Sequence, residues 1–357
     1  MTTRVLYIDD EISEPGRAAQ YIRSKLEAPG KFEIQLELPP KRLPGLTDLP
    51  EALLIDLDLT TAVVDGETIN YFGSTLASEM RMRHPACPIV LITKPNILTE
   101  YKSQIQMLED SIDVDLILDK DEVIKNPGET RAQITSLAVG FQALGSIEQH
   151  DWQAVLDLMQ ANPEEANLLR EAASPIKDWT IPQVARWIRK VVMGYPGILY
   201  EELTSATRLG INVEAFQDQT LQETLKSAKY KGIFSNQGKH WWRNRLYQIA
   251  QKLILQHDLK GPVHSIFNKA FYQEYSIQLA PSICVYDNKP VADWVCYVLK
   301  KPVKLKHSIP YYPDSRPDVM DQARVSFTAI DESPEFDERL VDADSYELVV
   351  KERWGIN

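Results

Sequence analysis

Three carboxylates, a threonine and a lysine follow short apolar runs in the first third of the sequence. Asp9 and Asp10 end one run, Asp56 ends a second, Thr93 ends a third, and Lys120 closely follows a fourth. Clustered carboxylates repel one another and attract a hard, oxygen-preferring dication such as Mg²⁺. A carboxylate can also attack phosphorus and form an acyl phosphate. The metal ion and the ammonium would then neutralise the transferred phosphoryl group, and the hydroxyl could donate to its oxygens.

The pattern of apolar residues predicts the elements that would bring these side chains together. Strands are predicted over 4–8, 32–38, 52–56, 88–92 and 116–118. Helical spacing over 15–27 and 73–83 places helices between strands, which indicates a parallel α/β sheet. Because ligands bind beyond the carboxyl ends of such strands, the side chains named above are expected to form one site.

Residues 4–145, about two fifths of the chain, resemble the receiver domain of response regulators. The matching pieces are VLYIDDE (5–11), LLIDLDL (53–59), GSTLASEMR (73–81), PIVLIT (88–93) and LILDK (116–120). This resemblance implies a flavodoxin-like fold, which is a doubly wound, five-stranded parallel sheet. It also implies that the chain belongs to a two-component phosphorelay.

The resemblance assigns a role to each of the candidate residues. Asp9 and Asp10 would hold Mg²⁺, and Asp56 would accept phosphate from a histidine kinase or a phosphotransfer protein. Thr93 would be the switch hydroxyl, and Lys120 would bind the phosphate. Phosphorylation could also drive dimerisation.

The sequence departs from the receiver pattern in several places. Prolines in 39–50 forbid a regular helix, so the second helix of the family is expected to be missing or distorted. The loop 57–73 is longer than usual and could cover the site or contact a partner. Asp58 is a second carboxylate close to Asp56 and is a further candidate metal ligand. Ile117 stands where the family often has a switching aromatic residue, so signal output is expected to use another surface.

The composition limits what the whole chain can be. Its 357 residues correspond to about two to three domains, and 44% hydrophobic with 25% charged residues is ordinary globular composition. No run of about 18 apolar residues and no signal-peptide pattern is present, so neither a membrane span nor secretion is expected. Three cysteines suit a reducing cytoplasm. The predicted domains are 1–145, 146–260 and 261–357.

The middle region is predicted to be helical and to carry a basic patch. Helices are predicted within 147–173, from a capping box at 180–183, over 199–209 and over 212–228, followed by a strand or turn at 230–234 and a tip at 235–238. This order fits a helix-turn-helix or winged-helix module. Residues 220–252 hold seven basic residues against one acid, a local charge of +6 in a chain of net charge −12. The patch includes Lys229, Lys231, Lys239, Arg243 and Arg245.

The patch has two interpretations. Together with Tyr230, Trp241 and Trp242 it could contact the phosphates of DNA or RNA. Alternatively, the lysines only solvate a helix end, the tryptophans are core anchors, and the region docks another protein. No helix here shows the Arg, Asn and Gln cluster of a base-reading surface, and the acidic net charge disfavours nucleic-acid binding over the whole surface.

The C-terminal region is predicted to be a small α+β unit. A helical or mixed segment is expected over 263–279, with strands over 282–286, 294–299, 302–307 and 324–330. The proline- and tyrosine-rich segment 309–317 suits a partner surface. The acidic segment 331–347 is expected to be solvated, or to cover the basic patch at rest. Cys284 and Cys296, even with His264 or His307, lack zinc-site spacing, so buried cysteines are expected.

The sequence leaves three possible functions for the region that follows residue 145. The first is a phosphorylation-controlled interaction protein that recruits a downstream protein, and the absence of catalytic motifs favours it. The second is a transcription regulator that uses the basic patch on DNA. The third is an unrecognised enzyme in the C-terminal unit, which requires a concave site with converging polar groups.

Overall fold

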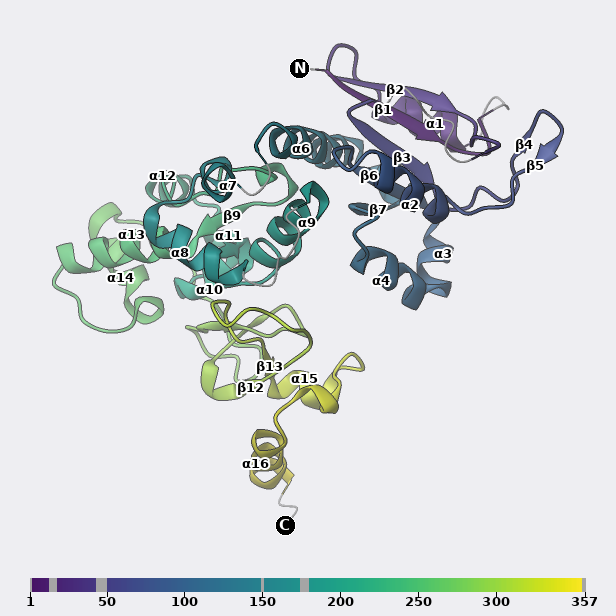
Figure 1. Cartoon of the computed structure of the whole chain (residues 1–357). Coiled ribbons are helices and arrows are strands. Elements are labelled where there is room, and N and C mark those ends of the chain that lie inside the picture. The colour runs from purple at the N-terminus through teal and green to yellow at the C-terminus, as the bar shows by residue number, and fades with distance from the viewer. Residues whose placement is uncertain (1, 13–17, 43–49, 149–150, 174–179, 355–357) are drawn as a thin grey trace. The chain divides into compact units, whose positions relative to one another are not determined.

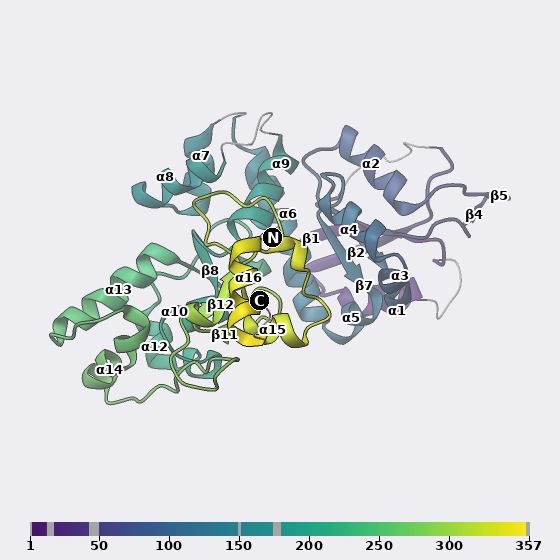
Figure 2. The same cartoon turned by 90° about the horizontal axis from the view of Figure 1, so that it is seen from below.

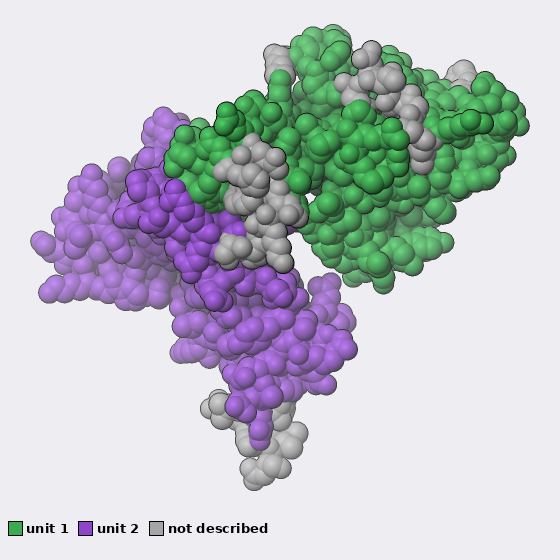
Figure 3. Space-filling view, viewed as in Figure 1, with its two compact units in different colours: residues 1–160, 176–189, 232–237 green, residues 161–175, 190–231, 238–357 purple. Residues whose placement is uncertain are grey.

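The chain divides into two compact units in the computed structural model, which describes residues 2–12, 18–42, 50–148, 151–173 and 180–354 (Figures 1 and 3). Unit 1 comprises residues 1–160, 176–189 and 232–237, and unit 2 comprises residues 161–175, 190–231 and 238–357. This grouping differs from the three predicted domains. Three stretches of the predicted middle domain, 146–160, 176–189 and 232–237, belong to unit 1, and the rest of that domain shares a unit with the C-terminal region.

Unit 1 is built on an all-parallel sheet of five strands in the order β2-β1-β3-β6-β7 (Figure 1). The strands are β1 (Thr3–Ile8), β2 (Phe32–Glu37), β3 (Ala52–Asp56), β6 (Ile89–Thr93) and β7 (Leu116–Asp119). All of β3 and β6 is buried, as expected for strands covered by helices on both faces. The order is the flavodoxin-like one, so the predicted fold class of this region is confirmed.

The helices of unit 1 lie between and after these strands. They are α1 (Ala18–Leu26), α2 (Gly73–Arg83), α3 (Pro95–Glu100), α4 (Lys102–Asp110), α5 (Lys120–Lys125), α6 (Pro127–Gly145), α7 (Trp152–Met159) and α9 (Ile181–Arg186). Residues 38–42 and 50–51 between β2 and β3 form no helix, in agreement with the prolines there, and 43–49 lie outside the described residues. The long loop after β3 contains the hairpin of β4 (Val63–Val64) and β5 (Glu67–Thr68).

Two stretches that follow the receiver-like region in sequence complete unit 1. We call residues 180–189 and 232–237 the distal segments. Phe234 lies against α6 so closely that a Cβ on Gly140 would sit 2.1 Å from its ring. Arg186 donates to the carbonyl oxygens of Glu109 and Ser111 at the end of α4, at 2.7 and 2.8 Å. The distal segments are therefore held by both packing and hydrogen bonds.

A buried carboxylate links one distal segment to the sheet. Asp115, just before β7, accepts a hydrogen bond from the backbone N–H of Ile89 at 2.8 Å and pairs with Arg81 of α2. Arg189 approaches its other oxygen to 4.0 Å and donates to Gln237 at 2.6 Å. Burial raises the pKa of Asp115, and the two arginines act against this rise.

Unit 2 begins with a helical part. Its elements are α8 (Pro163–Ala172), the C-terminal half of a π-helical segment (Trp187–Val192), β8 (Leu199–Glu201), α10 (Glu202–Arg208), α11 (Val213–Phe216), α12 (Gln219–Thr224), β9 (His240–Trp242), α13 (Arg243–Gln256) and α14 (Val263–Tyr275). Helices α13 and α14 lie side by side (Figures 1 and 2). Their core includes Phe216, Trp241, Phe267 and Phe271.

The predicted helices of the middle region are shorter in the structure. The segment 147–173 breaks at Gln160, which has a left-handed φ of 59°, before a capping box at Asn162 starts α8. The segment 199–209 opens as strand β8. The segment 212–228 splits because the Asp218 side chain accepts the N–H of Leu221 and so caps a new helix.

The β element of the middle region lies elsewhere in the sequence. Residues 230–234, predicted as a strand or turn, contain a turn at 233–234, and the strand is β9, which pairs antiparallel with β8. Residues 235–237, predicted as a tip, form a short 3-10 helix in unit 1 beside the buried Phe234. Phe234, which directly precedes the predicted tip, is therefore buried in unit 1 and does not lie in an exposed wing.

The C-terminal part of unit 2 has short strands and its own core. Strand β10 (Trp294–Val295) pairs with β11 (Pro302–Val303), and β12 (Ser308–Pro310) pairs with β13 (Arg324–Ser326). Helices α15 (Phe327–Glu332) and α16 (Ala343–Trp354) follow. Segment 282–286 is not a strand, and the predicted strand 324–330 turns into α15 because Ser326 caps that helix. Among the described residues no helix is both long and apolar enough to cross a membrane.

Candidate functional site

The residues predicted to act together lie at the carboxyl edge of the sheet. Asp9 follows β1, Asp56 is the last residue of β3, and Thr93 is the last residue of β6. The register pairs Asp56 with Ile92 and Thr93 with Asp119, the residue before Lys120. Adjacent parallel strands thus end side by side and present these side chains together.

The carboxylates form a cluster around the lysine. Oxygens of Asp9, Asp10 and Asp56 lie within 4.8 Å of one another. Lys120 Nζ is 3.3 Å from an oxygen of Asp9 and bonds to Asp56. The hydroxyl of Tyr7 donates to Asp9 at 2.6 Å. Asp9 is completely buried and Asp56 is 6% exposed, so both carboxylates are held in a fixed geometry.

Burial and neighbouring charges act in opposite directions on the pKa values of Asp56 and Lys120. Burial raises the pKa of Asp56 to about 7, with Lys120 acting against the rise and Asp9 adding to it. Burial lowers the pKa of Lys120, but the charges of Asp56 and Asp9 outweigh it and leave the pKa above its usual value. The ammonium of Lys120 thus contacts two of the three clustered carboxylates, and the oxygens of all three are the donors that Mg²⁺ prefers. The residues present fit a bound Mg²⁺.

The long loop reaches the site through a residue that the sequence did not single out. The hydroxyl of Thr61 donates to Asp10, which agrees with the expectation that this loop could cover the site. Asp58 lies outside the cluster. It is exposed, and its carboxylate accepts two hydrogen bonds from Thr60. The strand ends at Asp56, so the chain turns before Asp58 can face the other carboxylates.

Tyr7 was also missed by sequence reasoning. The available signal was its spacing, since side chains two residues apart in an extended segment point to the same side and Tyr7 precedes Asp9 by two. Gly73 likewise has a role that only the structure shows. A Cβ there would lie 2.0 Å from the backbone oxygen of Asp56, so a glycine lets α2 start against the end of β3.

Comparisons with known proteins found structural likenesses only. No family model and no curated protein matches the sequence. Response regulator DrrB of Thermotoga maritima matches over 38% of this chain and 52% of its own, at 15% identity and a TM-score of 0.27. The receiver domain of RcsB from Salmonella enterica serovar Typhimurium matches over 38% and 89%, at 21% and 0.28. A CheY-like receiver domain protein of Methanospirillum hungatei matches over 38% and 98%, at 11% and 0.26.

The observation that decides the likeness is the combination of strand order and carboxylate cluster described above. The N-terminal region is similar to response-regulator receiver domains. We call residues 3–145 the receiver segment. About three fifths of the chain lie outside it.

The predicted basic patch outside the receiver segment is partly neutralised. Lys229 and Lys231 are exposed, and Lys239 is exposed with Glu202 at 3.6 Å. Arg243 lies 3.6 Å from Asp321. Arg245 makes two bonds to Glu165, at 2.8 and 2.5 Å. Both arginines thus pair with carboxylates of unit 2 rather than standing free for phosphates.

The aromatic residues near the patch are buried. Trp241 and Trp242 are 1% and 0% exposed, and Tyr230 is 2% exposed and packs edge-on against Trp242. Buried rings cannot stack on nucleic-acid bases, so the interpretation of the two tryptophans as core anchors is confirmed.

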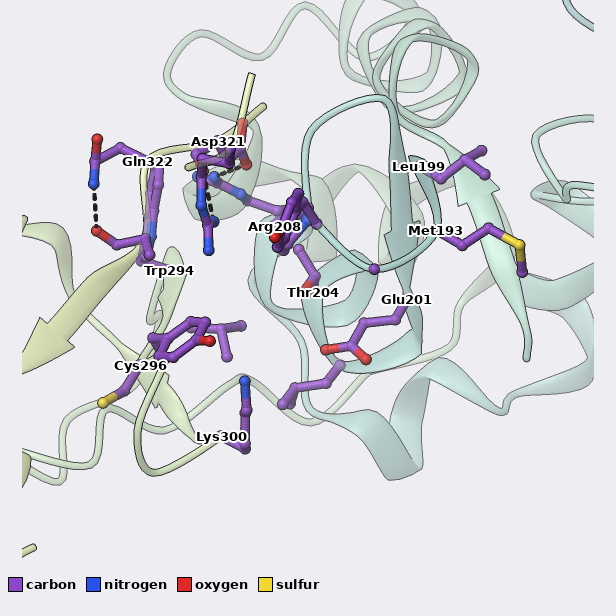
Figure 4. A pocket seen from close by; sticks show the side chains of 18 residues that line it. Met193, Leu199, Glu201, Thr204, Arg208, Trp294, Cys296, Lys300, Asp321 and Gln322 are labelled. Atoms are coloured by element: carbon purple, nitrogen blue, oxygen red, sulfur yellow. Dashed lines mark hydrogen bonds and ion pairs between the residues drawn. The ribbon is translucent and has the colours of Figure 1, made fainter. Parts of the chain in front are cut away.

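Unit 2 also contains a cavity of about 450 Å³ (Figure 4). It is lined by aromatic, apolar and charged side chains, among them Trp294, Tyr297, Glu201 and Lys300. The hydroxyl of Thr204 is buried there without a hydrogen-bond partner among the described residues. The concave site that an unrecognised enzyme would need is thus present.

Two arginines in this cavity already pair with carboxylates. Arg208 stacks 3.5 Å from the Trp294 ring and pairs with Asp321, which also accepts from Tyr200 at 2.9 Å. Arg316 makes two bonds to Asp314. No pairing of a nucleophile with a general base is seen among the described lining residues, so the cavity does not by itself indicate a reaction.

Proposed function

We propose that this chain is a response regulator whose receiver segment accepts a phosphoryl group on Asp56. The observation that carries the proposal is the cluster of Asp9, Asp10 and Asp56 around Lys120 at the carboxyl edge of the sheet. A buried carboxylate, an ammonium bonded to it and a metal-fitting oxygen set are what phosphoryl transfer to a carboxylate needs.

In the proposed reaction, an oxygen of Asp56 attacks the phosphorus of a phosphohistidine on a kinase or phosphotransfer protein. The P–N bond breaks, the donor imidazole leaves, and an acyl phosphate forms on Asp56. Lys120, which already bonds to this carboxylate, would hold an oxygen of the new phosphate. Bound Mg²⁺, held by Asp9, Asp10 and Asp56, would offset the negative charge of the phosphoryl group.

Thr93 and Arg186 offer a route from the site to the rest of the chain. Thr93 is buried at the end of β6, and its hydroxyl would turn to the phosphate. Helices α3 and α4 follow β6, and the end of α4 is held by Arg186 of a distal segment. A shift of β6 and α4 would change the population of conformations in which this contact is made.

Phosphorylation tests the proposal directly. The full chain is incubated with Mg²⁺ and acetyl phosphate or phosphoramidate, and its intact mass is followed. We expect a Mg²⁺-dependent gain of one phosphoryl group that Asp56→Asn abolishes. Asp58→Asn is the matched control, because this neighbouring carboxylate is exposed and lies outside the cluster, and it should leave the adduct intact. An adduct that survives Asp56→Asn, or none with any donor, would refute the assignment.

We infer that the output acts through a downstream protein rather than DNA. The support is that Arg243 and Arg245 pair with carboxylates and that the neighbouring rings are buried. Gel shifts with genomic fragments at low salt should show no salt-sensitive binding, in either phosphorylation state. Steeply salt-dependent binding would contradict this inference. A change in elution volume on phosphorylation would reveal dimerisation as part of the output.

A further inference from the structure

A second group of metal-ligand side chains lies in the C-terminal part of unit 2, far in sequence from the receiver segment. The thiol sulfur of Cys284 is 3.7 Å from Nδ1 of His307, and the same nitrogen is 3.6 Å from Oδ2 of Asp287. One ligand atom from each residue lies within 4.8 Å of the others. Ligand atoms that surround one zinc ion tetrahedrally, each about 2.0–2.3 Å from it, lie about 3.3–3.8 Å from one another. The separations between these three side chains are close to that range.

Backbone hydrogen bonds hold the three side chains in place. A tight turn joins Cys284 and Asp287, closed by the bonds of Asn288 N–H to the Cys284 carbonyl and of Cys284 N–H to the Lys289 carbonyl, both 3.0 Å. The bond from Val285 N–H to the Pro302 carbonyl brings the following strand alongside at 2.9 Å. His307 lies a few residues beyond that strand, at the end of a short 3-10 helix.

This part of the fold has little regular structure to stabilise it. Its paired strands, β10 to β13, are only two or three residues long, and its core is small. Small, loop-rich folds of this kind often rely on a metal ion or disulfides, since their cores bury little apolar surface. The cysteines of this core, Cys284 and Cys296, are both free thiols. A metal ion would connect segments that lie 23 residues apart.

We propose that Cys284, Asp287 and His307 bind one Zn²⁺ ion. A thiolate, a carboxylate and an imidazole are ligands that Zn²⁺ takes readily, whereas the all-oxygen cluster of the receiver segment suits Mg²⁺. Binding releases the thiol proton of Cys284 to solvent. The side chains of Asp287 and His307 are 17% and 16% exposed, so an ion can reach them from solvent.

Lysine charges near the site are compatible with an ion of this kind. Lys304 Nζ lies 3.0 Å from Oδ2 of Asp287. With thiolate and carboxylate both ionised, the loaded site carries no net charge, so the ammonium is not strongly repelled. Lys304 would then donate to the ligating carboxylate from outside, an arrangement common around bound metals.

Metal content of the full chain tests the proposal. The chain is stripped with a chelator, reloaded with Zn²⁺ in excess Mg²⁺ to occupy the carboxylate cluster, desalted, and analysed by elemental mass spectrometry. We expect about one zinc per chain in the wild type, and near none in Cys284→Ser or His307→Ala. Cys296→Ser is the matched control. Cys296 is buried in the same core, but its sulfur accepts backbone N–H groups of Leu299 and Ser326 at 3.5 and 3.3 Å, so zinc should be retained.

Cobalt gives a readout that needs no variant to fold. Co²⁺ loaded into the wild-type chain should show the near-ultraviolet charge-transfer band of a thiolate ligand, and Zn²⁺ should displace it. Absence of this band, zinc content unchanged in a folded Cys284→Ser chain, or equal loss of zinc in Cys296→Ser would each overturn the proposal. These outcomes are independent of phosphorylation at Asp56.

Discussion

Replacement of Asp56 by asparagine should stabilise unit 1 at neutral and alkaline pH. Burial raises the pKa of this carboxyl from 3.8 to about 7, so the folded state binds its proton more tightly than the unfolded state does. Its contribution to the free energy of unfolding therefore decreases as the pH rises from about 4 to about 7. Above that range the folded protein carries the full cost of a buried carboxylate.

The size of the effect follows from the same shift. Each pH unit between the folded and unfolded pKa corresponds to about 1.4 kcal/mol, so the upper limit is about 4 kcal/mol. This limit already includes the attraction of Lys120 for the ionised carboxylate, and relaxation of the buried site lowers it further. We expect a net stabilisation of about 1–3 kcal/mol at pH 8, falling toward zero near pH 4.5 where the folded wild type is protonated.

Hydrogen exchange of the amides in β1 and β3, measured without Mg²⁺, reports unit 1 alone. A gain of about 2 kcal/mol slows exchange about 30-fold at pH 8, relative to wild type at the same pH. At pH 5 the ratio should be several-fold smaller. Asp58→Asn, at an exposed carboxylate, should give a ratio near one at both pH values. Faster exchange in Asp56→Asn at pH 8, or a ratio independent of pH, would refute the reasoning.

Three further substitutions test other contacts of unit 1. Lys120→Met leaves Asp9 buried without its cation and should cost about 3–5 kcal/mol in urea denaturation, and a loss below about 1 kcal/mol would contradict the buried pairing. Gly140→Ala places a methyl group 2.1 Å from the Phe234 ring and should lower the free energy of unfolding by about 1–3 kcal/mol. In a Phe234→Ala background the same substitution should cost much less, because the ring is gone. Arg81→Met leaves the buried Asp115 with Arg189, 4.0 Å away, as its remaining cation and should lower the thermal midpoint by several degrees. An unchanged midpoint would contradict the buried pairing.

The receiver segment was predictable because its signals are local. Four of the five strands, β1, β3, β6 and β7, are apolar runs with a polar residue at or just after their end, and the parallel arrangement puts all such ends at one edge. The site residues Asp9, Asp56 and Lys120 follow from that rule alone. Asp58 is a case in which the rule fails. This residue lies in the turn two positions after the end of β3, and the turn directs its side chain away from the other carboxylates.

The rest of the chain depends on contacts between distant residues. Strand β8 is three residues long and pairs with β9 about forty positions later, so neither has a periodic pattern of its own. Phe234 was predicted to lie in a strand or turn, and its position in the core against Gly140 depends on a contact across about ninety residues that the local pattern does not show. Cys284, Asp287 and His307 likewise come together through a turn and a strand contact that spacing does not encode.

The late position of the distal segments in the chain affects when unit 1 can finish folding during synthesis. The strands of its sheet are complete by residue 119, but Phe234 belongs to the same unit. At about 5–20 residues per second, a ribosome adds the intervening stretch in about 6–25 s. During that interval the α6 surface around Gly140 and the carboxylate of Asp115 lack their final partners. During this interval a chaperone or another nascent chain can bind the nascent protein at these sites.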